Sequence, residues 1–291
     1  MIGKAPRGFH AALIYLAALI LLVISCGPIL WMLSQSLKSM NEIILKPYDA
    51  VPRQVTLAAF GDALHGGTYE NVRLARDFIN TIFYAGGSTI TNVVLGITAG
   101  YAFARLRFPL RKFLFGLVIV AMVVPTAAII IPLFMIVRTV SFGSGPLGWI
   151  NTYQGLILPS AVTGFTIVLA RQFLRGIPRE LDESALIDGC GPLTILWFVI
   201  LPLSGPAIAS VATLNFLTRW DDYLWPSVAG VSPDMFTLQV GLRFLEASYA
   251  QQWPLLMASC VLAALPIILL YVVLQPMFDR GLASFGTGWE A

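Results

Sequence analysis

The stretch LVIVAMVVPTAAIIIPLFMIV, residues 117–137, decides the class of fold. It carries no formal charge and does not alternate between polar and apolar residues. A strand of a transmembrane barrel alternates over about 10 residues, whereas a helix that crosses a bilayer needs about 20 consecutive apolar residues. The stretch therefore predicts a membrane-spanning helix, in which the backbone satisfies its own hydrogen bonds.

The composition of the whole chain agrees with a membrane protein. Of the 291 residues, 57% are hydrophobic and 11% are charged, and the mean hydropathy is +0.81. A soluble domain carries about 25% charged residues, and a disordered chain is far less apolar. The net charge of +3 comes without a long basic run, so no nucleic-acid partner is expected. The cysteines have neither disulfide nor zinc spacing, and we expect buried free thiols at Cys26, Cys190 and Cys260.

Long gaps between formal charges set the number of membrane crossings. Six gaps are each long enough to hold one crossing. We therefore expect an all-α integral membrane protein with six transmembrane helices, at about residues 11–33, 79–104, 112–138, 152–172, 195–217 and 253–277.

The basic residues of the short links orient these helices, because cytoplasmic links carry an excess of Lys and Arg. Such residues gather at the N-terminus, in the links around 105–112 and 171–179, and at the C-terminus. Residues 1–10 and 278–291 are therefore expected in the cytoplasm, and the long link 34–78 on the other side. A secretory signal that ends at Cys26 is the alternative interpretation, but the apolar run continues to Leu33 and is too long for a signal core.

The sequence has no motif for catalysis or nucleotide binding. It has no phosphate-binding loop, no nucleophile elbow and no His/Cys/Asp/Glu cluster with metal-ligand spacing. We expect no catalytic residue, no metal and no cofactor on this chain. The predicted helices lack charged residues at mid-depth, which argues against an ion-driven pump. Gly96 and Gly100 form a G-x-x-x-G pair that suits the close approach of two helices.

The link before the fifth predicted helix, residues 173–194, carries the most information about function. Pro178 and the acidic residues after it suit a helix N-terminus, and Gly189 suits a left-handed stop. We expect a short helix at about 178–188. Its small residues Ser184 and Ala185 suit a docking helix, although a solvated loop helix is the alternative on these grounds alone.

Two segments of this region resemble a family motif. Residues 183–190 read Glu-Ser-Ala-Leu-Ile-Asp-Gly-Cys, and residues 200–206 read Ile-Leu-Pro-Leu-Ser-Gly-Pro. They resemble the EAA loop of bacterial ABC-importer permeases, E-A-A-x-x-D-G-A, and the L-P-L-x-x-P that follows it. Ser184 and Cys190 depart from the motif, and both are small.

Further segments are similar to the carbohydrate-uptake branch of this family, and within it to the second, maltose-type permease subunit. They are Asn80-Thr81, Tyr-Ala-Phe-Ala-Arg-Leu-Arg-Phe at 101–108, Arg171-Gln-Phe, Ile-Pro-Arg-Glu-Leu at 177–181, and Trp-Asp-Asp-Tyr-Leu-Trp-Pro at 220–226. Asp221 stands where the family has asparagine, and residues 284–291 lack the family's ending.

The resemblance implies a type I ABC importer permease fold with its core at 79–277, in a bacterial inner membrane. It implies partners: a second homologous permease subunit, two ATPase subunits that bind ATP and Mg, an extracytoplasmic solute-binding protein and membrane lipid. The residues implied to couple to the ATPase are Glu183, Ser184, Ala185, Asp188 and Gly189. The implied hinge is Pro202 and Pro206, and the implied contact with the binding protein is Trp220, Asp221, Asp222 and Tyr223. The resemblance assigns no substrate residues.

A sugar or an oligosaccharide is the expected solute, with a glycerol-phosphate-type solute as the alternative. A stand-alone secondary carrier is a further alternative, because bent helices with polar residues also suit one. A membrane enzyme that uses Asp221, Asp222 or Glu246 is disfavoured, since adjacent residues on a helix do not face each other.

Overall fold

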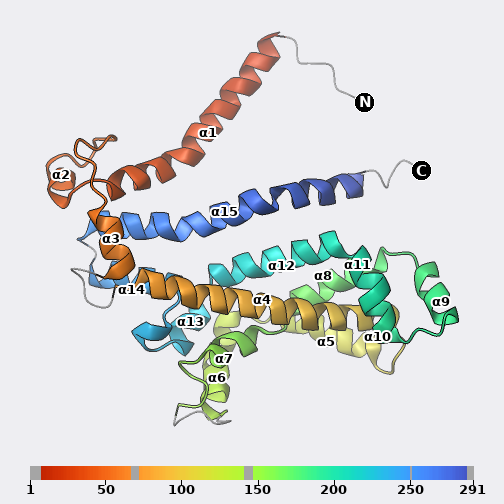
Figure 1. Cartoon of the computed structure of the whole chain (residues 1–291). Coiled ribbons are helices and arrows are strands. Elements are labelled where there is room, and N and C mark those ends of the chain that lie inside the picture. The colour runs from red at the N-terminus through yellow and green to blue at the C-terminus, as the bar shows by residue number, and fades with distance from the viewer. Residues whose placement is uncertain (1–7, 67–71, 141–146, 250, 287–291) are drawn as a thin grey trace. The chain divides into compact units, whose positions relative to one another are not determined.

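The computed structural model describes residues 8–66, 72–140, 147–249 and 251–286, and this part consists of helices and connecting loops without a strand (Figure 1). In chain order the elements are α1 (Gly8–Ser36), α2 (Met40–Leu45), α3 (Ala58–His65), α4 (Leu74–Arg105), α5 (Arg111–Val123), α6 (Thr126–Thr139), α7 (Tyr153–Ile157), the 3-10 turn η1 (Leu158–Ser160), α8 (Gly164–Arg175), α9 (Glu180–Ile187), α10 (Pro192–Ile195), the π-helical turn η2 (Leu196–Ile200), α11 (Leu201–Leu203), α12 (Gly205–Trp220), α13 (Leu224–Ala229), the 3-10 turn η3 (Pro233–Met235), α14 (Leu238–Ser248) and α15 (Trp253–Gly286).

The apolar helices account for all six predicted crossings. Among the described residues, three helices are long and apolar enough to cross a membrane alone, and the number rises to six if each of three bent pairs is one crossing. The single helices are α1, α4 and α15. The pairs are α5 with α6, α7–η1 with α8, and α10–α11 with α12, which are bent by 104°, 48° and 85°. The predicted all-helical membrane fold is confirmed, although helix ends differ: α4 begins at Leu74 rather than near residue 79.

The predicted helices 112–138, 152–172 and 195–217 are each a bent pair, so the prediction of one continuous helix is wrong at all three. In 112–138 the break follows α5. The helix ends at Val123, and Val124 has an extended backbone with φ −71° and ψ 121°. Pro125 causes the break because it has no N–H to continue the helix and disfavours a helical backbone in the residue before it. Pro132 lies inside α6 without a break.

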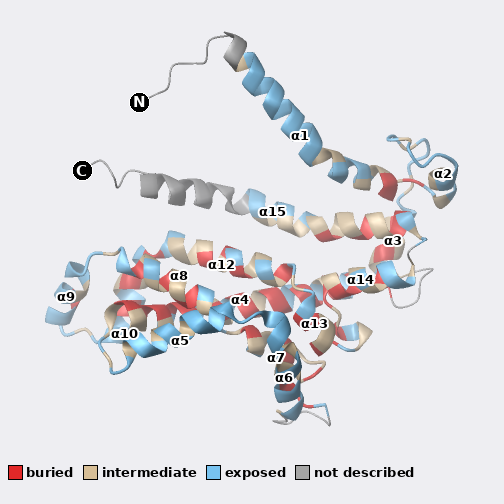
Figure 2. Ribbon diagram, turned by 180° about the vertical axis from the view of Figure 1, so that it is seen from behind, coloured by how far each residue is buried: buried red, intermediate tan, exposed pale blue. Residues whose placement is uncertain are grey.

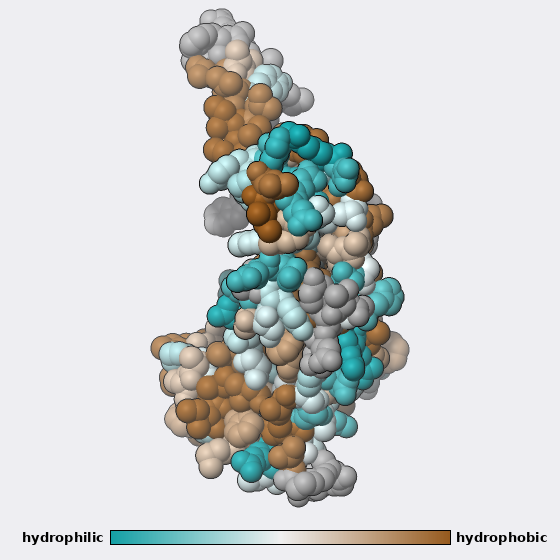
Figure 3. Space-filling model, turned by 90° about the vertical axis from the view of Figure 1, so that its left-hand side faces the viewer, coloured by the Kyte–Doolittle hydropathy of each residue, from teal (hydrophilic) through white to brown (hydrophobic). Residues whose placement is uncertain are grey.

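The chain divides into two compact units, Met1–Ala75 with Leu242–Pro266 and Arg76–Gly241 with Ile267–Ala291. In the first unit, every side chain of α1 from residue 12 to residue 25 is exposed, and its apolar side chains form the brown column at the top of Figure 3 (see also Figure 2). The loop after α1 folds around Lys38, which is fully buried, donates to the Asp49 carbonyl oxygen and lies 5.7 Å from the centre of the Trp31 ring.

The second unit is built along α4, which has a buried cluster near each end. The Tyr101 cluster comprises Ile97, Tyr101, Ala104, Ala170, Leu174, Ala185, Ile195, Leu196 and Ile200. The Tyr84 cluster comprises Tyr84, Val137, Ile150, Leu156, Trp225, Ala229 and Met235. At about 1.5 Å per residue, Tyr84 and Tyr101 lie about 25 Å apart along α4. This separation is close to the thickness of a bilayer core, which is about 30 Å.

Candidate functional site

The short helix predicted in the link 173–194 is α9. Three acidic residues in its first turn favour the positive end of the helix dipole. It ends in a Schellman motif, in which the Cys190 N–H donates to the Ala185 carbonyl (2.9 Å) and the Gly189 N–H donates to the Leu186 carbonyl (3.0 Å). Gly189 has φ +81°, which confirms the predicted left-handed stop. The helix begins at Glu180, two residues later than predicted, and Pro178 lies just before the N-cap residue Arg179.

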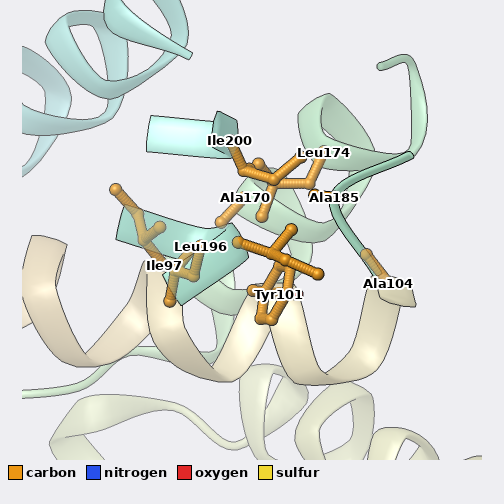
Figure 4. Close-up of a cluster of buried hydrophobic side chains, with 9 residues drawn as sticks. Ile97, Tyr101, Ala104, Ala170, Leu174, Ala185, Leu196 and Ile200 are labelled. Carbon is orange, nitrogen blue, oxygen red and sulfur yellow. The ribbon is translucent and has the colours of Figure 1, made fainter. Parts of the chain in front are cut away.

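The two faces of α9 differ in their surroundings. Ala185 is 8% exposed and packs in the Tyr101 cluster (Figure 4). On the other side Leu186 and Ile187 are 55% and 87% exposed, and the carboxylates of Glu183 and Asp188 are exposed beside them. Figures 1 and 2 place α9 at the end of the unit, next to α10. The helix is therefore held by one face and presents apolar and acidic side chains on the other, as a protein-docking element does.

Arg105, the last residue of α4, ties α9 to the rest of the unit. Its Nη2 donates to the carbonyl oxygens of Leu174 (2.7 Å) and Ile177 (2.6 Å). Its Nη1 lies 3.2 Å from Asp182 Oδ2, and the two side chains are only 5% and 15% exposed. One guanidinium thus joins the end of α4, the end of α8 and the first turn of α9 through charge-assisted hydrogen bonds.

Sequence reasoning missed this role of Arg105. In the sequence, Arg105 stands out only as one basic residue of the link after the second predicted helix and as part of the segment 101–108. No local spacing connects it with Asp182, because the two positions are far apart along the chain and meet only through the packing of α4 and α8.

Close packing of α4 on α8 provides the base for this arrangement. A Cβ atom at Gly96 would lie 2.4 Å from Thr166 Cγ2, and one at Gly100 would lie 2.7 Å from Ala170 Cβ and 3.0 Å from the backbone nitrogen of Arg171. These distances leave no room for a side chain at either glycine. The predicted close approach at the G-x-x-x-G pair is confirmed, and the partner helix is α8.

The chain bends by 85° between Leu203 and Gly205, where Pro202 and Pro206 flank the break. The π-helical turn η2 precedes the bend, and the Ser204 hydroxyl donates to the Ile200 carbonyl (2.7 Å). Pro206 lies in the first turn of α12, where its missing N–H costs nothing. A hinge motion at these prolines stays a prediction.

The opposite end of the unit contains the residues predicted to meet a binding protein. Trp220 is 1% exposed, with ring centroids 5.6 Å from Phe78 and 5.5 Å from Phe216. Two aromatic rings thus cover the Trp220 side chain, and its contact with a binding protein stays a prediction. Asp221 and Tyr223 are exposed and keep their predicted role as candidates.

Asp222 also points inward at this end. Its Oδ2 accepts from the Tyr84 hydroxyl (2.6 Å) and lies 3.2 Å from Arg219 Nη1, and its side chain is 15% exposed. Asp222 thus fixes the end of α12 against α4, and its contact with a binding protein stays a prediction.

Asn80 and Tyr153 hold a second connection here, which sequence reasoning also missed. Asn80 Nδ2 donates to the carbonyl oxygens of Asp234 (2.8 Å) and Phe236 (2.9 Å), and its Oδ1 accepts from the Tyr153 hydroxyl (2.7 Å). Asn80 therefore joins α4, α7 and the loop around η3. Within the described residues, no three His, Cys, Asp or Glu side chains lie where they could hold a metal ion.

Comparison with known proteins places these features in a family. Residues 92–284 match the family described as "Binding-protein-dependent transport system inner membrane component". A sulfoquinovosyl glycerol transport system permease protein of Agrobacterium fabrum is 31% identical over 274 residues, which cover 94% of this chain and 92% of the relative. An sn-glycerol-3-phosphate transport system permease protein of Rhizobium meliloti is 32% identical over 276 residues, covering 93% of this chain and 95% of the relative.

Two further comparisons extend this similarity. An arabinooligosaccharide transport system permease protein of Halalkalibacterium halodurans is 34% identical over 209 residues, or 72% of each chain. Among solved structures, a chain of a bacterial ABC transporter involved in the import of the acidic polysaccharide alginate superimposes with a TM-score of 0.77 at 24% identity. This match covers 95% of this chain and 99% of that chain, and it shows the same fold.

Proposed function

This chain belongs to the binding-protein-dependent transport system inner-membrane component family, and from this premise we propose that it couples ATP hydrolysis to the import of a sugar or an oligosaccharide through α9. It is a multi-pass membrane permease subunit of an importer. In this family the ATPase is a separate subunit, so the permease transports without being an enzyme itself.

The observation that carries the proposed coupling role is the contrast between the two faces of α9. Its inner face is fixed by Ala185 in the Tyr101 cluster and by the Arg105–Asp182 ion pair. Its outer face offers Glu183, Leu186 and Ile187 to a partner. A force on the outer face would therefore be transmitted to α4 and α8 rather than absorbed by a loose loop.

The complex that we propose contains this chain, a second homologous permease subunit, two ATPase subunits that bind ATP and Mg, and an extracytoplasmic solute-binding protein. Both termini lie in the cytoplasm in this arrangement. The contacts of Arg105 with Leu174 and Ile177 support it, because they bring the two most basic links to one end of the unit. Asp221 and Tyr223, at the opposite end, are the proposed contacts for the binding protein.

A mutation of the outer face of α9 tests the coupling role. Leu186→Asp places a charge in the proposed contact, and we expect solute-stimulated ATPase activity and uptake to fall by about tenfold or more. Glu183→Gln should lower both in the same direction. The measurement is uptake and ATPase activity of the complex, purified with its partner subunits and reconstituted in vesicles.

Leu45→Asp is the matched control, since Leu45 is 79% exposed at the end of α2, far along the chain from the coupling loop. It should leave both activities unchanged. Full activity of the Leu186→Asp and Glu183→Gln variants would contradict the coupling role. Solute uptake by the chain alone, without ATP or an ATPase subunit, would indicate a secondary carrier instead.

A glycerol-phosphate solute is the second candidate, because a glycerol-3-phosphate permease covers nearly the whole chain at 32% identity. Thermal shift of the cognate binding protein separates the two classes. Stabilisation by oligosaccharides supports the sugar importer. Stabilisation by glycerol phosphate alone would contradict it and would indicate a glycerol-phosphate importer instead.

A further inference from the structure

Five cationic side chains gather around the link between α4 and α5 and the end of α8: Arg107, Arg111, Lys112, Arg171 and Arg175. Within the described part of the chain, none of them forms an ion pair with a carboxylate, unlike the neighbouring Arg105. Like charges that face one another without a counter-charge repel each other, so an anion that binds among them is favoured.

Part of this cluster is held in place by neighbouring groups. Arg111 Nη1 donates to the Leu106 carbonyl (2.8 Å), and the Arg171 guanidinium lies 4.1 Å from the centre of the Phe115 ring. The Phe115 ring in turn packs against Phe103, with centroids 5.4 Å apart. Arg111 and Arg171 are therefore held in place before any ligand arrives, which lowers the entropic cost of binding an anion beside them.

An open cavity of about 600 Å³ lies at the same link, lined by Arg107, Phe108, Leu110, Arg111, Lys112 and Phe113. Two of its apolar members are exposed, Leu110 at 69% and Phe113 at 61%. Exposed apolar side chains continue along α5, where Leu117 is 48% exposed. Cationic and apolar groups thus meet where a membrane-crossing helix begins.

We propose that this link is a binding site for an anionic phospholipid. The phosphate of the headgroup would lie against Arg107 and Lys112, and the acyl chains would lie against Leu110, Phe113 and the exposed face of α5. Basic side chains at the end of a membrane-crossing helix attract anionic headgroups. The apolar flank decides between ligands: a free phosphate or an acidic protein surface would use the cations but would leave Leu110 and Phe113 in water.

Lipid binding to the full-length chain tests this site. The chain is purified in mild detergent with the subunits that accompany it, delipidated, and titrated with phosphatidylglycerol or phosphatidylcholine, and bound lipids are counted by native mass spectrometry. We expect wild type to prefer phosphatidylglycerol. Each basic residue near an anionic headgroup strengthens binding by about fivefold, so Arg107→Gln with Lys112→Gln should weaken phosphatidylglycerol binding by about 25-fold.

Two further variants make the test specific. Arg107→Lys with Lys112→Arg keeps both charges and should retain binding. Lys46→Gln with Arg138→Gln removes one lysine and one arginine that are exposed elsewhere, and it should bind as wild type does. Melting temperatures show that each variant is folded.

Several outcomes would overturn the proposal. Equal binding of the two lipids, or equal loss in the Lys46/Arg138 control, would exclude a specific anionic site. Displacement of phosphatidylglycerol by inorganic phosphate alone would indicate a phosphate site instead. Loss of accompanying subunits with unchanged lipid binding would assign the cations to a protein contact.

Discussion

Arg105→Ala is expected to abolish solute uptake while the chain still inserts in the membrane. The substitution removes the partner of Asp182, which is only 15% exposed, and the donor to the carbonyls of Leu174 and Ile177. Breaking a buried ion pair by removing one member costs about 3–5 kcal/mol. Since each 1.4 kcal/mol is a factor of ten, the docked arrangement of α9 would lose more than about a hundredfold in population. Uptake and solute-stimulated ATPase activity in reconstituted vesicles measure the loss.

Two variants separate the effect of the hydrogen bonds of the Arg105 guanidinium from the effect of its positive charge, and from general effects of removing an arginine. Arg105→Lys keeps the positive charge but cannot reach two carbonyls and a carboxylate at once, so we expect intermediate activity. Arg138→Ala removes an exposed arginine at the end of α6 and should leave uptake unchanged. Uptake of the Arg105→Ala variant at the level of wild type would show that α9 is held by packing alone.

Gly100→Leu is expected to prevent folding altogether, which is the largest effect on stability that we predict. A Cβ at this position would already lie 2.7 Å from Ala170 Cβ and 3.0 Å from a backbone nitrogen of α8. The rest of a leucine side chain would force α4 and α8 apart, and the backbone atoms cannot yield as a flexible side chain could. We expect no folded protein after extraction, measured by size-exclusion chromatography and thermal melting in detergent.

Gly116→Leu is the matched control for Gly100→Leu, because it makes the same substitution in another apolar helix. Apart from its chain neighbours and the backbone of α5 itself, no atom lies within 4 Å of a Cβ placed at Gly116, so this variant should fold and melt as wild type does. If Gly100→Leu gave folded protein with an unchanged melting temperature, α4 and α8 would not pack as closely as described.

The parts of the fold that sequence predicts are those whose signal lies within a segment. The apolar, uncharged composition of residues 117–137 predicts that they lie in the membrane. Gly189 predicts the end of α9, because a left-handed backbone favours glycine. Pro125 and Pro132 show the limit of such signals. Both lie in one apolar stretch, yet only Pro125 breaks the helix, and the sequence around them gives no signal that distinguishes the two positions.

The candidate site could be predicted only in part for the same reason. The motif around residues 183–189 is contiguous, so its helix could be placed from sequence. The ion pair of Arg105 with Asp182 and the cover that Phe78 provides for Trp220 depend on contacts between distant segments. A tryptophan that follows an apolar helix usually suits the membrane surface, and here the fold buries it instead.

Photo-crosslinking from position 187 tests the central claim most directly. Ile187 is 87% exposed on α9, and a photoreactive amino acid placed there should crosslink to the ATPase subunit of the complex in native membranes. The same probe at Tyr48, which is 89% exposed in the loop after α2, should not reach that subunit. Crosslinks from position 187 to lipid or to the extracytoplasmic binding protein, with none to a nucleotide-binding subunit, would contradict a docking role for α9.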